Sequence, residues 1–255
     1  MLPALKLKKR PPVRLSRENL PVASGGSARC RRRPLIHAFA AIAAASSTYA
    51  AATDVPSLVS TGSPPNVPAC SSCHGAAGEG NAAAGFPRLA GIGSSYIASQ
   101  LSAFAAGTRP DPVMGPIAKA LNSDQKQAVS IYYAALPSAF THVIVNEADV
   151  QPAVGGAWLA NRGRWNDGLA ACVGCHGSGG AGVSPTFPPL AGQSAAYLAA
   201  QLNGWKAGKR PPGPMGLMSH VAAKLDATDI RDVSQYFATL RPVAPATPKN
   251  LGRSK

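Results

Sequence analysis

Apolar residues recur at helical spacing in four segments of the chain, which form two similar pairs. The first pair covers residues 95–106 and 198–205, and the second covers residues 129–136 and 230–240. Each segment places its apolar side chains on one face of a helix, so we expect four amphipathic helices. The apolar positions are Ile97, Leu101 and Phe104; Leu198, Leu202 and Trp205; Val129, Tyr132, Tyr133 and Leu136; and Ile230, Val233, Phe237 and Leu240.

The ends of these segments carry residues that are typical of helix termini. Gly107 and Gly208 follow the first pair, where a helix often ends in left-handed backbone that suits glycine. The second pair begins after polar residues that can cap a helix and ends before a proline. The candidate caps are Asn122 or Ser123 and Asp226 or Thr228, and the prolines are Pro137 and Pro242. Gly-rich and Pro-rich sequence before the helices predicts loops.

The four segments belong to one internal repeat. A Cys-x-x-Cys-His-Gly motif begins at Cys70 and again at Cys172, an offset of 102 residues. Further matches then follow at an offset of 101 and, after the insertion of three residues between Pro211 and Leu225, of 104. The matched positions include Phe86-Pro87 and Phe187-Pro188, Leu89-Ala90-Gly91 and Leu190-Ala191-Gly192, Arg109-Pro110 and Arg210-Pro211, and Leu121 and Leu225.

Most of the chain's excess positive charge lies in its first fifth. The net charge is +14, but residues 1–52 hold ten Lys and Arg with one acidic residue, and residues 53–255 hold fifteen with ten. The rest of the chain therefore has no basic stripe of the kind that nucleic-acid-binding proteins present. Arginines before an apolar run at 35–45, and small residues at 50–52, predict a cleaved export signal over 1–52. An uncleaved N-terminal anchor is the alternative.

The Cys-x-x-Cys-His motifs predict covalent attachment of two c-type haems. Cys70 and Cys73 would form thioethers to one porphyrin and Cys172 and Cys175 to the other, with His74 and His176 as the proximal iron ligands. Two haems would also supply the apolar mass that the low aromatic content, 6%, leaves missing. A structural zinc site has its Cys pairs about 15–20 residues apart, and a thioredoxin-like pair lies near a βαβ pattern. Neither those alternatives nor two local disulfides explain a histidine in both copies.

The sixth iron ligand would distinguish an electron carrier from a catalyst. A methionine occupies the sixth coordination position, which leaves no site for a substrate, and it raises the reduction potential of the haem. Met114 is the candidate for the first haem. Met218 and Met215 compete for the second, and Met218 is favoured because it precedes Leu225 by the seven residues that separate Met114 from Leu121. Met215 is then a core filler. His220 is a weaker competitor for this iron, and His142 is expected at the surface.

Four further residues are candidates for contacts around the haems. Pro87 and Pro188 could each offer a carbonyl to the second ring nitrogen of the axial histidine. Arg109 and Arg210 could bind haem propionates through paired hydrogen bonds. The alternative for each arginine is a solvated loop charge.

This arrangement resembles the dihaem cytochrome c4 family of class I cytochromes c over roughly residues 66–242. The resemblance implies an all-α fold with two tandem cytochrome c domains about a pseudo-twofold axis, each with His/Met-ligated iron. We place domain 1 at 53–136, the linker at 137–153, domain 2 at 154–242 and a C-terminal tail at 243–255. Domains of this family open with a helix, which residues 157–165 can form. Pro64, Pro65 and Pro68 are expected to prevent it in domain 1.

The resemblance implies a periplasmic carrier of single electrons between a respiratory donor and a terminal acceptor, rather than an enzyme. Its partners would be redox proteins such as a cytochrome complex, oxidase or dehydrogenase, with no nucleic acid and no small-molecule substrate; peripheral membrane association stays open. One alternative is the haem subunit of a periplasmic dehydrogenase complex. A small dihaem peroxidase is another, but it would need an iron without a firm sixth ligand, and a methionine in each copy argues against it.

Overall fold

A computed structural model describes residues 54–63 and 65–242. All of these residues belong to one structural unit. The predicted export signal at 1–52, Pro64 and the tail at 243–255 fall outside the described residues.

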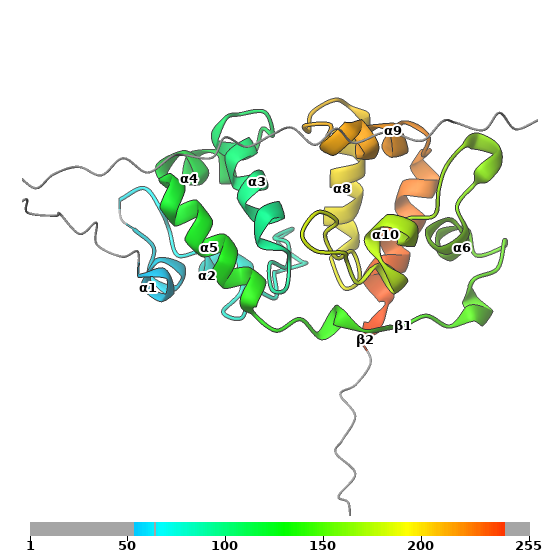
Figure 1. The fold of residues 1–255 in the computed structure, drawn as a ribbon, viewed down its shortest axis with the longest axis horizontal. Coiled ribbons are helices and arrows are strands. Elements are labelled where there is room, and N and C mark those ends of the chain that lie inside the picture. The colour runs from blue at the N-terminus through cyan, green and yellow to red at the C-terminus, as the bar shows by residue number, and fades with distance from the viewer. Residues whose placement is uncertain (1–53, 64, 243–255) are drawn as a thin grey trace, which may run out of the picture. The chain divides into compact units, whose positions relative to one another are not determined.

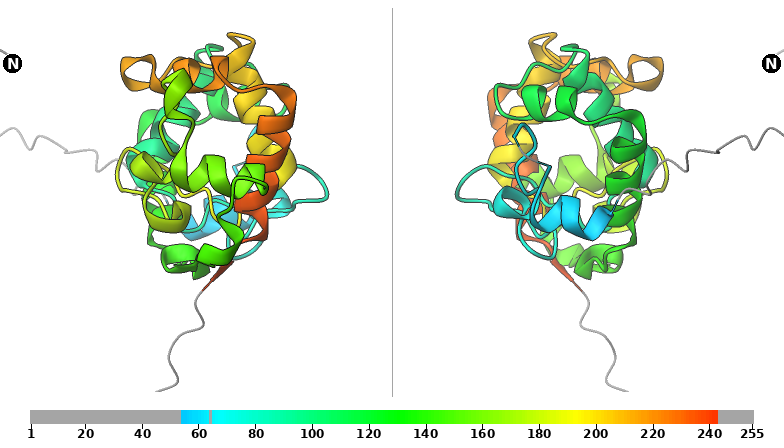
Figure 2. Two further views of the ribbon diagram at one scale, coloured as in Figure 1. Left: turned by 90° about the vertical axis from the view of Figure 1, so that its right-hand side faces the viewer. Right: turned by 90° about the vertical axis from the view of Figure 1, so that its left-hand side faces the viewer.

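The described chain is mostly helical, and its helices repeat in order (Figures 1 and 2). The first copy contains α1 (Val55–Ser60), α2 (Ser71–His74), α3 (Ser94–Ala105), α4 (Met114–Ala120) and α5 (Ser123–Ala135). The second contains α6 (Gly155–Arg162), α7 (Val173–His176), α8 (Ala195–Lys206), α9 (Leu217–Ala223) and α10 (Ala227–Thr239). Short 3-10 turns are η1 (Ala139–Thr141), η2 (Glu147–Asp149), η3 (Trp165–Asp167), η4 (Ser178–Gly180) and η5 (Pro214–Gly216). The predicted all-α class and internal repeat are confirmed.

Helices α5 and α10 begin at predicted caps, and α3 and α8 end at the predicted glycines, although α8 begins three residues before its predicted segment. Asn122 caps α5 and Asp226 caps α10, each in a capping box with the residue three positions later, so these two candidates are the caps. Gly107 and Gly208 adopt positive φ angles of 73° and 65° just beyond α3 and α8. A side chain at either position would be strained, which explains why glycine ends both helices.

Each copy has its own apolar core. In the first, α3 packs against α4 and α5, and the buried side chains include Ile97, Leu101 and Phe104 from α3. In the second, α8 and α6 pack against α10, with Leu198, Val233 and Phe237 buried between them. The faces predicted from apolar spacing are therefore the faces that the helices bury.

The first copy does contain an opening helix, which corrects one expectation. Helix α1 packs against α5, as α6 packs against α10. Its only proline is Pro56, in the first turn, where a missing N–H costs no hydrogen bond within the helix. Pro65 and Pro68 follow the end of the helix, so they do not interrupt it. Asp54 caps the helix by accepting a hydrogen bond from the N–H of Ser57.

Two further helices occupy sequence that was expected to be loop. Helix α4 begins at Met114 and α9 begins one residue before Met218. Both are only seven residues long, so their apolar periodicity is too short to distinguish them from loop. Ala118 and Ala222 are the fully buried residues of these helices. The two methionines therefore lie at equivalent helix starts.

The linker forms a short extended piece. Strand β1 (Val143–Ile144) pairs antiparallel with β2 (Arg241–Pro242), with Val143 opposite Pro242. Val145 lies beyond the strand. The chain after domain 1 is thus attached to the end of domain 2. Among the described residues, no helix is long and apolar enough to cross a membrane.

Candidate functional site

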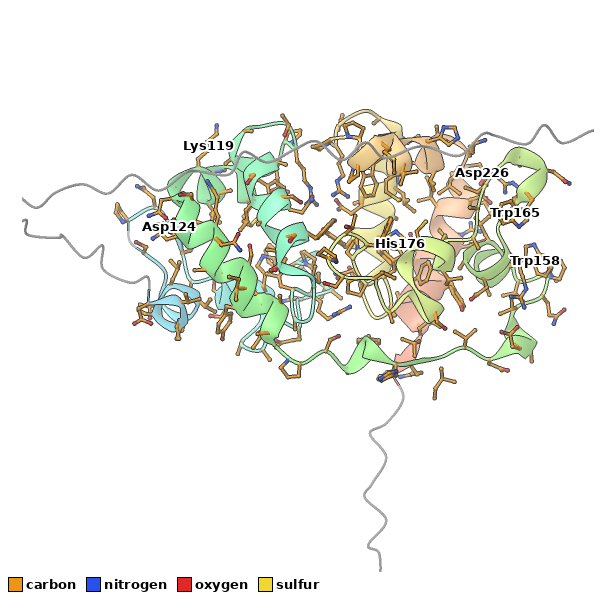
Figure 3. All side chains as sticks on the ribbon, viewed as in Figure 1. Lys119, Asp124, Trp158, Trp165, His176 and Asp226 are labelled. Carbon is orange, nitrogen blue, oxygen red and sulfur yellow. The ribbon has the colours of Figure 1, made fainter. Side chains whose placement is uncertain are left out.

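Each Cys-x-x-Cys-His motif forms a single helical turn. In α2 and α7 the histidine is the last helical residue and is buried, with 7% of its surface exposed in both copies. The backbone N–H groups of His74 and His176 donate to the carbonyls of Cys70 and Cys172, respectively. The turn therefore holds the backbone of the two cysteines and the histidine of one motif in a fixed arrangement. Figure 3 marks His176 in the second copy.

The imidazole rings are fixed by the residues that the sequence singled out. Nδ1 of His74 lies 2.9 Å from the Pro87 carbonyl oxygen, and Nδ1 of His176 lies 2.8 Å from that of Pro188. Because a carbonyl oxygen only accepts, Nδ1 carries the proton and Nε2 is the nitrogen with a free lone pair. Burial lowers the pKa of both rings, which outweighs the opposing effect of these hydrogen bonds. Both imidazoles are thus neutral at pH 7, the form that binds iron.

The four cysteines of the motifs are not joined in disulfides, so their sulfur atoms are available for covalent attachment. These cysteines are Cys70, Cys73, Cys172 and Cys175. Burial raises the pKa of Cys70, and it raises that of Cys172 to about 11, so both stay protonated near neutral pH. Within the described residues, no three His, Cys, Asp or Glu side chains are grouped to hold a metal ion. The zinc alternative therefore has no geometric support there.

The methionine candidates differ in exposure. Met114 is half-buried and packs against the core of the first copy, and Met218 is also half-buried. Met215 is 88% exposed and has a positive φ of 55°, so it does not fill the core as expected. His220 and His142 are both exposed. The exposures favour Met114 and Met218 over Met215.

Arg109 and Arg210 are buried in one polar cluster between the two copies. The Arg109 guanidinium donates to Gln100 at 2.8 Å, and across the domains to Gln201 at 2.6 Å and to the Tyr197 hydroxyl at 3.1 Å. The Arg210 guanidinium of domain 2 donates in turn to two residues of domain 1, to Gln100 at 2.8 Å and to the Tyr96 hydroxyl. The reciprocal contacts follow the repeat, as a twofold relation between the copies requires.

Within the part of the chain that the structure describes, this cluster has two guanidinium groups and no carboxylate among their hydrogen-bonding partners. Only 7% of Arg109 and 8% of Arg210 is exposed, so the solvated-charge alternative is wrong for both. Nε and Nη1 of Arg210 are buried without a hydrogen bond. Buried charge needs a partner of opposite sign. Haem propionates would supply the missing carboxylates, so the residues present fit the group.

Two interdomain residues were missed by the sequence analysis. Arg88 and Gln193 are buried and form hydrogen bonds with each other, across a separation of 105 residues. Both occur where the repeat is broken, because their counterparts are Pro189 and Ile92. The available signal in the sequence was that each of these polar residues occurs in only one copy of the repeat. That difference does not indicate that the two residues contact each other across the domains.

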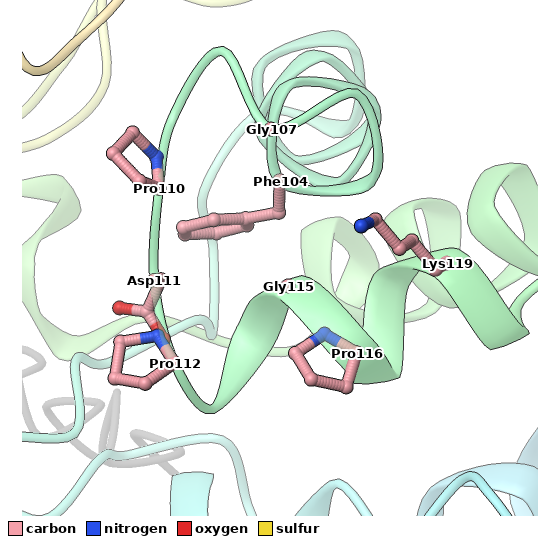
Figure 4. A pocket seen from close by; sticks show the side chains of 8 residues that line it. All are labelled: Phe104, Gly107, Pro110, Asp111, Pro112, Gly115, Pro116 and Lys119. Atoms are coloured by element: carbon pink, nitrogen blue, oxygen red, sulfur yellow. The ribbon is translucent and has the colours of Figure 1, made fainter.

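A surface hollow adjoins the segment that carries Met114 (Figure 4). It has a volume of about 530 Å³, and its lining residues are Phe104, Gly107, Pro110, Asp111, Pro112, Gly115, Pro116 and Lys119. No cysteine or histidine lines it. This hollow is therefore distinct from the haem-binding motifs.

Comparison with known proteins assigns the family. The Cytochrome c family model matches residues 67–151 and 169–241, one copy each. Cytochrome c4 from Azotobacter vinelandii is 36% identical over 182 residues, covering 67% of this chain and 84% of the relative. The chain belongs to the dihaem cytochrome c4 family. A thiosulfate dehydrogenase electron acceptor from Stutzerimonas stutzeri is 45% identical over 179 residues, covering 70% of this chain and 82% of the relative.

Solved structures agree with this assignment. Reduced cytochrome c4 from Pseudomonas stutzeri has a TM-score of 0.59 at 32% identity, covering 68% of this chain and 93% of that one. Thiosulfate dehydrogenase (TsdBA) from Marichromatium purpuratum has a TM-score of 0.65 at 45% identity. That match covers 74% of this chain but only 40% of the other chain.

As a dihaem cytochrome c, the protein is an electron carrier with two covalently bound haem c groups. Bound haem supplies an iron that takes up and releases one electron at a time. At each haem, the chain's own residues would attach the porphyrin through two thiols, present one neutral imidazole and keep that ring oriented through a carbonyl.

Proposed function

We propose that this cytochrome accepts electrons from a thiosulfate-oxidising dehydrogenase and passes them to a terminal acceptor. The observation that carries the proposal is the 45% identity to a thiosulfate dehydrogenase electron acceptor, against 36% to a cytochrome c4. A second electron acceptor of the same description, from Thiomonas intermedia, is 44% identical. The partner class is inferred from these relatives, since a shared fold alone does not determine a redox partner.

The proposal places the protein in the periplasm. Its support is the basic and apolar pattern of residues 1–52, which suits an export signal cleaved near Ala50–Ala52. We expect N-terminal sequencing of protein from a periplasmic fraction to begin close to Thr53. A mature chain that still carries the arginines at 29–33 would support the anchor alternative instead.

The iron ligands in the proposal are His74 with Met114 and His176 with Met218. Their support is the buried, carbonyl-bound imidazole in each copy and the half-buried methionine at each equivalent helix start. With both sixth positions closed, the peroxidase alternative has no open iron to use.

Stopped-flow spectroscopy tests the proposed donor. Oxidised cytochrome is mixed with a purified thiosulfate dehydrogenase and thiosulfate, and the haem absorption is followed. We expect both haems to be reduced, with two electrons taken up per chain. We also expect this reduction to be faster than that of Azotobacter vinelandii cytochrome c4 under the same conditions. Thiosulfate without the enzyme is the control and should reduce neither haem. Reduction no faster than that of cytochrome c4 would favour a general respiratory carrier instead.

Copurification tests the subunit alternative. If the cytochrome is a permanent subunit, it should elute together with a dehydrogenase during size-exclusion chromatography of a cell extract. We expect the two proteins to separate, because the proposed partnership is transient. Coelution through high salt would instead show a stable complex.

A further inference from the structure

The segments that follow the two haem motifs differ at two places in the repeat. Arg88 follows Pro87 in the first copy, whereas Pro189 follows Pro188 in the second. Gln193 in the second copy corresponds to Ile92 in the first. The two departures meet in space: Gln193 of domain 2 lies against the backbone of Arg88 of domain 1. This polar contact therefore has no equivalent at the matching positions of the repeat, Pro189 and Ile92.

The Gln193 amide binds both backbone groups of Arg88. Its Oε1 accepts from the Arg88 N–H at 3.0 Å, and its Nε2 donates to the Arg88 carbonyl at 3.1 Å. Both residues are buried, with 4% of Gln193 and 6% of Arg88 exposed. The contact is thus shielded from water, where a hydrogen bond is electrostatically stronger than at the surface.

The Arg88 N–H and the Pro87 carbonyl belong to one peptide group. That carbonyl accepts the hydrogen bond from Nδ1 of His74 at 2.9 Å. Three groups are therefore linked in a row: the Gln193 amide, the peptide between Pro87 and Arg88, and the imidazole of His74. Hydrogen bonds in such a chain polarise one another, strengthening each by roughly 10–30%.

We propose that Gln193 of domain 2 is a positioning residue that lowers the reduction potential of the haem in domain 1. By accepting from the Arg88 N–H, it makes the Pro87 carbonyl a stronger acceptor for His74. A stronger hydrogen bond at Nδ1 increases the basicity of the imidazole as a ligand. A more basic ligand favours the more highly charged ferric iron, which lowers the potential.

Domain 2 has no equivalent link. Nδ1 of His176 lies 2.8 Å from the Pro188 carbonyl, but the next residue is Pro189, which has no N–H to donate. Ile92, at the position corresponding to Gln193, has no acceptor in its side chain. Both proximal histidines thus donate to a proline carbonyl, and only the peptide group that binds His74 is also hydrogen-bonded to a side chain, that of Gln193. The hydrogen bond to Gln193 therefore gives the two haems different reduction potentials although their proximal ligands are similar.

Further contacts at the interface hold the Arg88 side chain in place. The Arg88 guanidinium donates to the Ala191 carbonyl at 2.9 Å, across the domains, and to Ser138 Oγ at 3.0 Å. It also lies over the ring of Phe140, 5.2 Å from the centroid. These contacts fix the Arg88 side chain independently of its backbone N–H, so the two can be varied separately.

A redox titration of Gln193→Leu tests the proposal. Leucine has a similar size to glutamine but no hydrogen-bond acceptor, so it removes the partner of the Arg88 N–H without creating a large cavity. We expect the equilibrium of the domain 1 haem to shift about threefold towards the ferrous form. That is a rise of ~28 mV at about 59 mV per tenfold change in a one-electron couple. The domain 2 haem should keep its potential, although the substitution lies in domain 2.

Ser138→Ala is the matched control. It removes a partner of the Arg88 side chain but leaves the Arg88 N–H and Gln193 in place, so both potentials should stay unchanged. The two haems are distinguished by the NMR signals of their methyl groups. Hydrogen exchange provides a second measurement, in which the Arg88 amide should exchange faster in Gln193→Leu than in Ser138→Ala. An unchanged domain 1 potential, or an equal shift of both haems, would overturn the proposal.

A second pair of variants covers the case in which Gln193→Leu does not fold. Arg88→Pro gives domain 1 the Pro-Pro sequence that domain 2 already carries, and it deletes the N–H. Arg88→Leu removes the same guanidinium but keeps the N–H. The domain 1 potential should be higher in Arg88→Pro than in Arg88→Leu. Equal potentials would contradict a role for the N–H.

Discussion

At the scale of single residues, one motif predicts most of the site. The spacing Cys-x-x-Cys-His identifies both thiol pairs and both histidines, and the repeat singles out Pro87 and Pro188, whose carbonyls bind the rings. The surroundings of Arg109 and Arg210 could not be predicted, because their partners lie in the opposite copy. Such contacts depend on how two domains meet, which no local pattern encodes.

The choice between two methionines is tested by substitution. Met218→Ala should leave one of the two haems without a sixth ligand, so that haem becomes high-spin and its potential falls. Met215→Ala should change neither property, because Met215 is 88% exposed. Absorption spectroscopy of the Met–iron charge-transfer band, combined with a redox titration, measures both effects. The opposite pattern would identify Met215 as the ligand.

At the scale of secondary structure, long periodic segments were predictable and short ones were not. Helices α3, α5, α8 and α10 each have 12 or 13 residues, enough to show an apolar face. Helices α1, α4 and α9 have six or seven, and their formation depends on packing against neighbours. The prolines near α1 were misleading because their effect depends on their position within the helix.

Close packing of α6 on α10 predicts a cost for a single methyl group. A Cβ at Gly156 would lie 2.2 Å from the Asp232 carbonyl oxygen, so Gly156→Ala must push the helices apart. We expect domain 2 to lose about 1–3 kcal/mol of unfolding free energy in urea titrations. Gly155→Ala is the control, since its Cβ would lie 3.8 Å from the nearest atom. Equal stabilities of the two variants would show that the helices do not meet at Gly156.

The start of α10 predicts a dependence of stability on pH. Burial raises the pKa of Asp229, but hydrogen bonds from Arg164 and the Asp226 N–H outweigh it, and the net pKa is lowered. A lowered pKa in the folded state means that the carboxylate stabilises the fold above its unfolded pKa of about 3.9. This contribution is lost as the pH falls through the lower, folded pKa.

Asp229→Asn should therefore destabilise domain 2 by about 1–2 kcal/mol at pH 7, a modest amount because Arg164 is partly exposed. The difference from wild type should shrink in urea unfolding below about pH 4. Asp232→Asn is the control, because its partner Arg231 is mostly exposed, and it should leave the stability of domain 2 nearly unchanged at every pH. A cost for Asp229→Asn that does not vary with pH would contradict the ionic contribution.

At the scale of the whole molecule, the two copies are alike in their attachment motifs and differ where they meet. The reciprocal contacts of Arg109 and Arg210 preserve the repeat across the interface, whereas Gln193 and Arg88 break it. An interface of this kind can join two similar carriers and still give their haems different potentials.

The attachment of two haems is the central claim, and the intact mass of the mature chain tests it most directly. Protein purified from cells that express the full chain and analysed by mass spectrometry under denaturing conditions should carry the added mass of two haem groups, one for each Cys-x-x-Cys-His motif. Denaturation removes any haem that is not covalently bound. A mass that matches the bare polypeptide, or the polypeptide with a single haem, would contradict the account.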